Sequence, residues 1–126
     1  MAIQWRQLAE ALVAALEPAL PSGFQARVEA EAGGIAFLRS DVPAAWVVVG
    51  VQTLLEQPGD ERELLSLVCW SVLSTAQDFV AESTGEPWPG SGKNLPSPGV
   101  QVLDAQVRLW YGQRESPTLV VGPIHR

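Results

Sequence analysis

One long apolar segment constrains the fold of this chain more than any other feature. Asp60 and Glu63 have the spacing of a helix capping box, and Gly85 is suited to end a helix in a left-handed conformation. The pattern predicts a helix of about 24 residues, or ~36 Å, running to Ser83 or Thr84. Its first half is apolar on nearly every side: Leu64, Leu65, Leu67, Val68, Cys69, Trp70, Val72 and Leu73. Such a helix is buried all round, and one sheet cannot cover every face, so we expect the first helix or a second copy of the protein on its far side.

The residues before this helix predict one helix and three strands. Residues 3–17 are rich in alanine and leucine at helical spacing. Residues 24–31 alternate between apolar and polar, a glycine pair supplies a tight turn, and residues 35–39 return as a second strand. The β-branched run at residues 46–51 predicts a strand buried on much of both faces, and we place it at the centre of the sheet.

The residues after the long helix predict a loop, a hairpin and a last strand. Residues 86–99 are rich in proline and glycine without periodicity, which is typical of a long loop. Apolar residues alternate in 100–102 and 107–111 on either side of a two-residue turn, with Val102 opposite Val107. Residues 118–121 predict a final short strand.

These elements define the expected fold class. Consecutive strands joined by short turns favour antiparallel pairing, so the class is α+β. We expect one antiparallel sheet of five to six strands with two helices packed on one face, in the order α-β-β-β-α-β-β and a possible further strand. The length of 126 residues is that of one domain, and no boundary divides residues 1–126.

The composition predicts self-association. Hydrophobic residues make up 47% of the chain and charged residues only 17%, so apolar groups exceed what one small globule readily covers. The five tryptophans are more than one core usually needs, and we expect one or two of them near the surface. We therefore expect a homodimer, with Leu64, Leu67 and Trp70 of the long helix in the core or at the dimer interface.

The charge excludes some partners. The net charge is −6, and the eight Lys and Arg residues form no cationic stripe, so neither nucleic acid nor an anionic membrane is an expected partner. A basic protein or peptide is the compatible one, although acidity also serves solubility. The single cysteine excludes an internal disulfide, and the N-terminus shows no secretion signal, so we expect a cytoplasmic protein.

Few residues could support catalysis. The only histidine, His125, lies next to the C-terminus, and the only cysteine, Cys69, lies in the predicted buried helix. We therefore predict no enzyme, no cofactor and no metal site. The alternative is a small hydrolase or metal-dependent enzyme that uses Asp78, Glu82 and Glu86, whose carboxylates could exchange protons or hold a hard cation.

The remaining candidate site is apolar. Pro87, Trp88, Pro89 and Leu95 combine an aromatic side chain with fixed extended backbone, and Trp110 and Tyr111 of the last hairpin are the aromatic residues expected beside them. This set either clamps the loop to the body of the protein or forms a groove for a partner segment. A buried Trp88 would indicate the clamp, and an accessible Trp88 the groove.

Two resemblances bear on function. The string from Ala76 through Pro87-Trp88-Pro89 to Leu109-Trp110-Tyr111-Gly112 resembles a family of small, uncharacterised α+β proteins of actinobacterial type. That resemblance implies no activity and no catalytic residue. The order of elements, the size and the acidity also resemble the type III secretion chaperone class, which are dimers that bind an extended segment of a partner, although strands here replace a final helix.

We therefore predict a non-enzymatic protein-binding module, a homodimeric adaptor or chaperone-like protein. Its binding surface would be apolar and would lie on the sheet or on the loop at residues 86–99 that contains Pro87, Trp88 and Pro89, which we call the Trp-Pro loop. Its partner would be another protein or an extended peptide segment. A structural subunit derived from a phage or an injection machine is a further alternative, which would assemble into rings instead of dimers.

Overall fold

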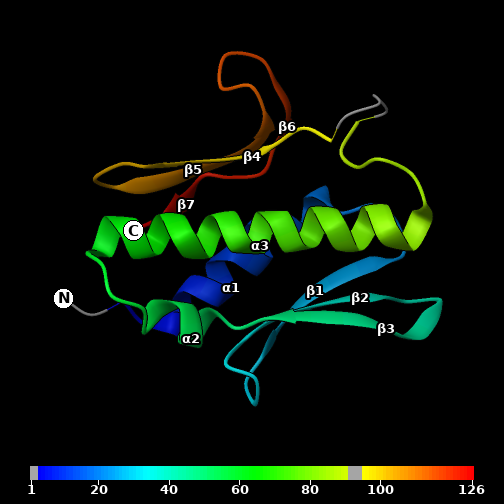
Figure 1. Ribbon diagram of the computed structural model, residues 1–126, viewed down its shortest axis with the longest axis horizontal. Helices are drawn as coiled ribbons and strands as arrows, with labels where there is room; N and C mark the ends of the chain where they lie inside the picture. The colour runs from blue at the N-terminus through cyan, green and yellow to red at the C-terminus, as the bar shows by residue number, and fades with distance from the viewer. Residues whose placement is uncertain (1–2, 91–94) are drawn as a thin grey trace.

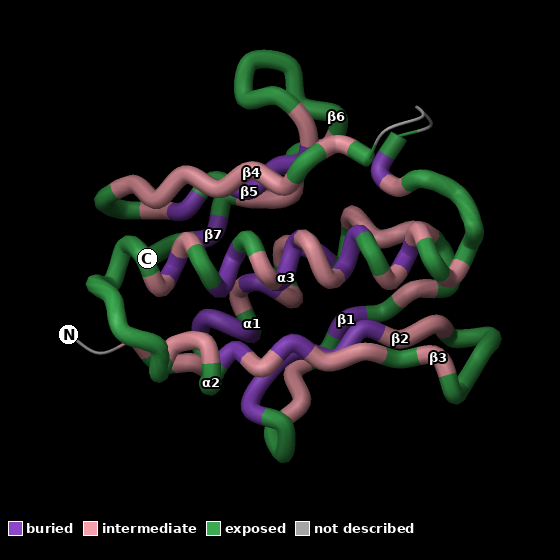
Figure 2. Tube along the Cα trace, in the orientation of Figure 1, coloured by how far each residue is buried: buried purple, intermediate pink, exposed green. Residues whose placement is uncertain are grey.

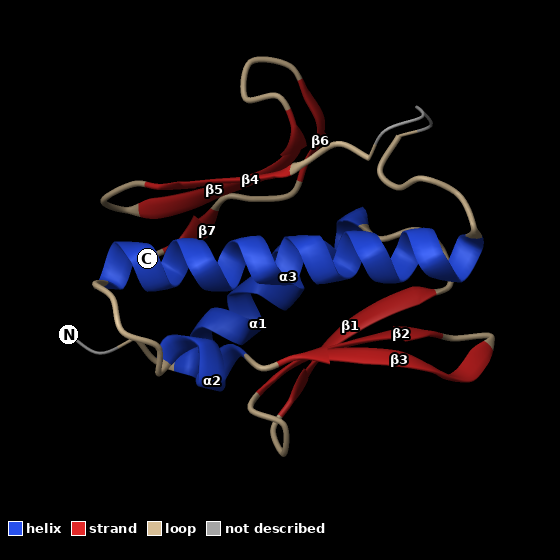
Figure 3. Ribbon diagram, viewed as in Figure 1, coloured by secondary structure: helices blue, strands red, loops and turns tan. Residues whose placement is uncertain are grey.

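The long helix lies in the middle of the molecule, between two antiparallel sheets (Figure 1). The computed structural model describes residues 3–90 and 95–126. The first sheet has the order β1-β2-β3, and the second has the order β4-β5-β6, with β7 also paired to β5 (Figure 3). The helices are α1 (Trp5–Leu16), a 3-10 turn (Glu17–Ala19), α2 (Val51–Leu55) and α3 (Glu61–Thr84). The strands are β1 (Phe24–Glu29), β2 (Gly34–Arg39), β3 (Val42–Val49), β4 (Pro98–Val102), β5 (Gln106–Gly112), β6 (Pro117–Val120) and β7 (Ile124–His125).

The α+β class and the antiparallel pairing are confirmed, but the single sheet with two helices on one face is wrong. The described chain has seven strands instead of the expected five to six, and they form two separate sheets, of three and four strands. The physical reason is the apolar surface of α3, which needs cover on more than one side. The chain supplies that cover itself, because β3 of one sheet and β4 of the other both pack against α3.

The position of β3 is also different from the prediction. Among the strands that the structure describes, β3 pairs with β2 alone, so it forms an edge of its sheet, and β2 is the central strand. Most of β3 is exposed or half-buried, and the chain turns into α2 at Val51. Its β-branched composition indicates a strand correctly, but composition does not distinguish an edge strand from a central one.

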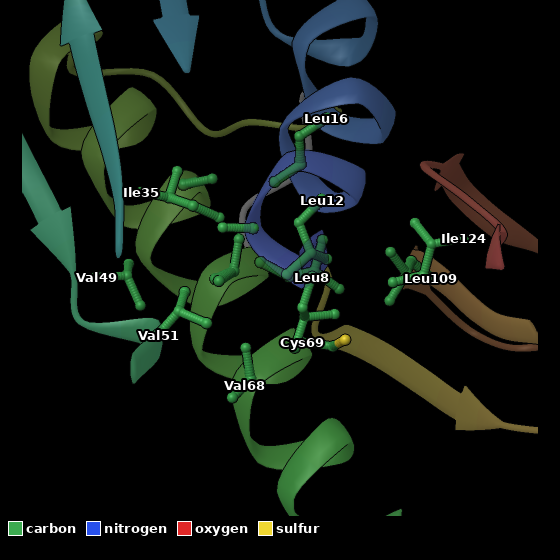
Figure 4. Close-up of a cluster of buried hydrophobic side chains, with 14 of the residues drawn as sticks. Leu8, Leu12, Leu16, Ile35, Val49, Val51, Val68, Cys69, Leu109 and Ile124 are labelled. Atoms are coloured by element: carbon green, nitrogen blue, oxygen red, sulfur yellow. The ribbon is translucent and has the colours of Figure 1, made fainter. Parts of the chain in front are cut away.

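The core lies where α1, α3 and the two sheets meet (Figure 4). One face of α1 enters it, and the buried part of the chain follows α3 and the inner faces of both sheets (Figure 2). The side chains that share this cluster include Leu8, Leu12, Leu16, Ile35, Val49, Val51, Val68, Cys69, Leu109 and Ile124. By length and composition α3 could also cross a membrane, a property that core helices of soluble proteins share.

Both ends of α3 are as predicted. The carboxylate of Asp60 accepts a hydrogen bond of 2.8 Å from the backbone N–H of Glu63, which caps the first turn. Gly85 ends the helix at a φ of 72°, and its N–H donates to the carbonyl of Ala81. Arg39 of β2 donates to the carbonyl of Ser83 in the last turn, so a cation lies at the negative end of the helix dipole.

The two predicted hairpins are confirmed in their pairing. Val28 lies opposite Ile35 in β1 and β2, and Val102 lies opposite Val107 in β4 and β5. Two arginines join the turn of the second hairpin to the start of α3. Arg62 of α3 donates to the carbonyl of Val102 at 2.8 Å. Arg126 donates both to the carbonyl of Leu103 at 2.8 Å and to the carboxylate of Glu61 in α3 at 3.0 Å.

The uneven burial of α3 predicts unequal effects of truncation along it. Leu73 is fully buried and Leu67 is 38% exposed on the same helix. Leu73→Ala should lower the free energy of unfolding by about 2–5 kcal/mol, because it removes buried contacts and leaves a cavity. The matched control Leu67→Ala should change it by about 1 kcal/mol or less. Equilibrium denaturation in urea measures both, and equal losses would contradict the assignment of the buried face.

Candidate functional site

The Trp-Pro loop is packed against the protein. The ring of Trp88 lies 5.3 Å from that of Tyr111, at an interplanar angle of 65°, and Pro89 is buried. The hydroxyl of Tyr111 donates a 2.6 Å hydrogen bond to the backbone carbonyl of Leu73 in α3. Burial, with the charge of Asp78 as a smaller cause, raises the pKa of Tyr111, so this hydroxyl stays protonated and keeps donating.

A buried glutamine fixes the far end of the loop. The side-chain amide of Gln77 donates to the carbonyl of Pro96 at 2.6 Å, and among the described residues Gln77 is the one buried polar or charged side chain. In the sequence Gln77 stands next to the charged Asp78, and nothing in the local pattern indicates this role. A polar residue next to a buried stripe is not recognisable as buried until its partner is known.

The structure therefore separates the six residues predicted to bind a partner. Tyr111 is fully buried and Trp110 is 9% exposed, with its indole over Gly99 and its Nε1 donating to the carbonyl of Gly112 at 3.1 Å. Trp88 is half-buried, with its ring against Tyr111, so it lies between the buried state of a clamp and the accessible state of a groove. Pro87 and Leu95 are exposed, and residues 91–94 of this loop lie outside the described residues.

Exposed apolar side chains gather on α3 and β3 instead. Trp46 of β3 is 60% exposed and Trp70 of α3 is 50% exposed, so two of the five tryptophans reach the surface, as expected. Leu67 lies one turn before Trp70, and Leu64 is half-buried. Because β3 is an edge strand, Trp46 lies beside a strand edge that has no partner in the described part of the chain.

A hollow separates the edge of β3 from α3. We call it the β3 groove; it measures about 500 Å³ and is lined by Ala44, Ala45, Trp46, Val47, Thr75, Asp78, Phe79, Glu82 and Ser83. A second hollow, of about 400 Å³, lies on the outer face of the same sheet and includes Ala36, Leu38, Trp46 and Val48. Trp46 borders both hollows, so one indole links the strand edge to the uncovered sheet face.

The wall of the β3 groove is acidic. Asp78 and Glu82 are exposed, lie four residues apart on α3, and form no ion pair with a cation of residues 3–90 and 95–126. The neighbouring cation Arg39 is already bound, to Asp41 at 2.9 Å and to the carbonyl of Ser83. The groove thus presents carboxylates without a counter-ion from the described chain.

The other candidate groups do not converge. Cys69 is buried in the core, and burial raises the pKa of its thiol to about 12. His125 is exposed on β7, and Glu86 lies beyond the end of α3. Within the described residues no three His, Cys, Asp or Glu side chains gather to hold a metal ion, so Asp78, Glu82 and Glu86 do not form such a site there.

Comparison with known proteins does not place the chain in a family. No family model matches it, and no curated protein or solved structure matches it either. The resemblances to the actinobacterial-type family and to secretion chaperones stay predictions. Function is therefore inferred from the residues of the groove and from the fold.

The burial of Cys69 predicts an unreactive thiol. At about pH 8 the folded protein should hold this group as the neutral thiol, because its pKa lies near 12, and a thiolate is the reacting species. Ellman's reagent should give no colour with the native protein and should report one thiol per chain after denaturation in guanidinium. A fast reaction of the native protein would contradict the placement of Cys69 in the core.

Proposed function

We propose that this protein is a non-enzymatic binding module that holds an extended segment of another protein along the β3 groove. The observation that carries the proposal is Trp46, a large aromatic side chain left 60% exposed on an edge strand between two hollows. Tryptophan in such a position is typical of a contact surface, because its burial contributes strongly to binding.

An edge strand supplies a second means of recognition. An extended segment can add to the open edge of a sheet and form main-chain hydrogen bonds with it, which gives affinity without demanding a particular sequence. The pairing of β2 with β3 shifts register between Leu38 and Arg39 of β2, so the stretch of β3 around Pro43 is irregular, which disfavours the addition of a strand there. The regular stretch from Trp46 to Val49 is the part that would receive the segment.

The Trp-Pro loop has a supporting part in this proposal. The ring of Trp88 lies against Tyr111 and Pro89 is buried, so both residues offer less surface to a partner than the 60% exposed Trp46 does. The predicted chaperone-like role is kept, and of the two predicted surfaces, the sheet and the loop, the proposal takes the edge of the sheet.

A homodimer is part of the same proposal, through a different surface. Leu67 and Trp70 are three residues apart and exposed on one face of α3, where water contacts two large apolar side chains. A second copy packed on this face would bury both of them together with half-buried Leu64. The two tryptophans then have separate tasks, with Trp46 for the partner segment and Trp70 for the second copy.

Peptide selection tests the binding proposal. Peptides selected from a random phage library against the immobilised protein should shift backbone NMR signals of β3. Trp46→Ser should weaken their binding by about tenfold or more, because an anchoring aromatic contact is lost. The matched control Trp70→Ser removes a tryptophan of similar exposure and should leave the affinity unchanged. Selected peptides that bind the Trp46→Ser variant as well as the wild type would overturn the proposal.

Light scattering during size-exclusion chromatography tests the dimer. The wild type should elute with the mass of two chains, and Leu67→Ser with Trp70→Ser should give a monomer with unchanged circular dichroism. The Trp46→Ser variant should remain a dimer. A wild-type protein that stays monomeric at high concentration would contradict the dimer interface at Leu67 and Trp70. It would leave the proposed binding at the β3 groove unaffected.

A further inference from the structure

We propose that the segment held in the β3 groove carries basic side chains at alternate positions, two residues apart, that pair with Asp78 and Glu82. This inference rests on the proposed function, since it names the chemistry of the partner that the groove takes. It makes Asp78 and Glu82 the residues that determine specificity, whereas Trp46 and the strand edge supply the general affinity.

The spacing of the two carboxylates fits an extended chain. Residues four apart on an α-helix are separated by about 6 Å along its axis, so Asp78 and Glu82 lie on one side of α3 at that distance. Side chains on one face of a strand recur every second residue, at about 6.6–6.8 Å. Figure 1 shows β3 running alongside α3, so a strand added to β3 follows the same direction as the two acids. Alternate side chains of that strand would therefore meet Asp78 and Glu82 in turn.

The pleat decides what lies between the basic positions. In the register of the sheet, Val47 lies opposite Phe37 on the inner face, and Trp46 lies opposite Leu38 on the outer face. Side chains of an added strand that do not face α3 must therefore lie on the outer face, beside Trp46 and the hollow that Leu38 and Val48 line. The same hollow is lined by Arg27, Glu29 and Glu31, so the intervening positions face a mixed apolar and charged surface. The preferred pattern is therefore defined by a basic residue at every second position.

Charge also decides against a second copy in this place. In a two-fold dimer the same patch faces itself, so an interface centred on the groove would bring Asp78 and Glu82 of one chain toward the same residues of the other. Like charges at such a contact oppose association, and the net charge of −6 adds to the effect. A cationic segment would be attracted both by the two carboxylates and by the net negative charge of the protein. The described chain offers the two carboxylates no counter-ion of its own.

Two synthetic peptides of equal composition separate this inference from general binding. In the first peptide valine and lysine alternate, so that one face of the extended chain carries only lysine. In the second peptide the same residues are ordered as lysine pairs and valine pairs, so that lysine and valine alternate along each face. Titration calorimetry with the full chain should show tighter binding of the alternating peptide and a decrease in affinity with added salt. Asp78→Asn with Glu82→Gln should weaken that binding about three- to tenfold. The matched control Glu10→Gln with Glu115→Gln removes the same charge from exposed positions on other elements and should leave the affinity within about twofold.

The outcomes distinguish the two proposals. Equal affinity for both peptides, or no effect of the Asp78 and Glu82 substitutions beyond that of the control, would overturn the basic pattern. If Trp46→Ser still weakened the binding in that case, the groove would remain a binding site for segments of another chemistry. If Trp46→Ser changed the affinity for neither peptide and for no phage-selected peptide, the proposed function itself would fail, and this inference with it.

Discussion

The burial of α3 is the constraint on which the rest of the structure depends. A helix of 24 residues that is apolar around most of its first half must be covered on several sides at once. The chain meets this need with α1 and two small sheets, so each sheet contributes one inner face to a shared core. Two sheets have more edges than one sheet of the same strands, and the outer face of the first sheet is left without a helix to cover it.

This arrangement explains why the proposed binding surface lies beside α3. The strands nearest the helix, β3 and β4, are both edge strands, so the uncovered stripe of α3 is flanked by open sheet edges. Along β3 the edge carries Trp46 and faces Asp78 and Glu82 across a hollow. In the proposed function, one extended ligand would therefore receive apolar contact, main-chain pairing and charge from the same groove.

The sequence predicted what depends on neighbours in the chain. The cap at Asp60, the end at Gly85 and the pairing of Val102 with Val107 follow from local spacing, and the structure has all three. It did not predict that Gln77 is buried, and it left open whether Trp88 packs on Tyr111, because both depend on where a distant segment returns. The sequence predicted Trp88 as a partner-binding residue and did not predict Trp46. Proline-rich sequence around an aromatic residue is typical of both a clamp and a groove, so the sequence could not distinguish them.

By itself the sequence determined the two longer helices, the strands of the two hairpins and the need to cover α3, because hydrophobic periodicity, capping residues and turn glycines act within a few residues of each other. It did not determine α2 or β7. Only the tertiary structure decided which strands became edges and which tryptophans reached water. A β-branched strand such as β3 satisfies the same local preferences at the centre of a sheet or at its rim. Its place is fixed by how many faces of α3 each sheet can cover, and that is a property of the whole packed chain.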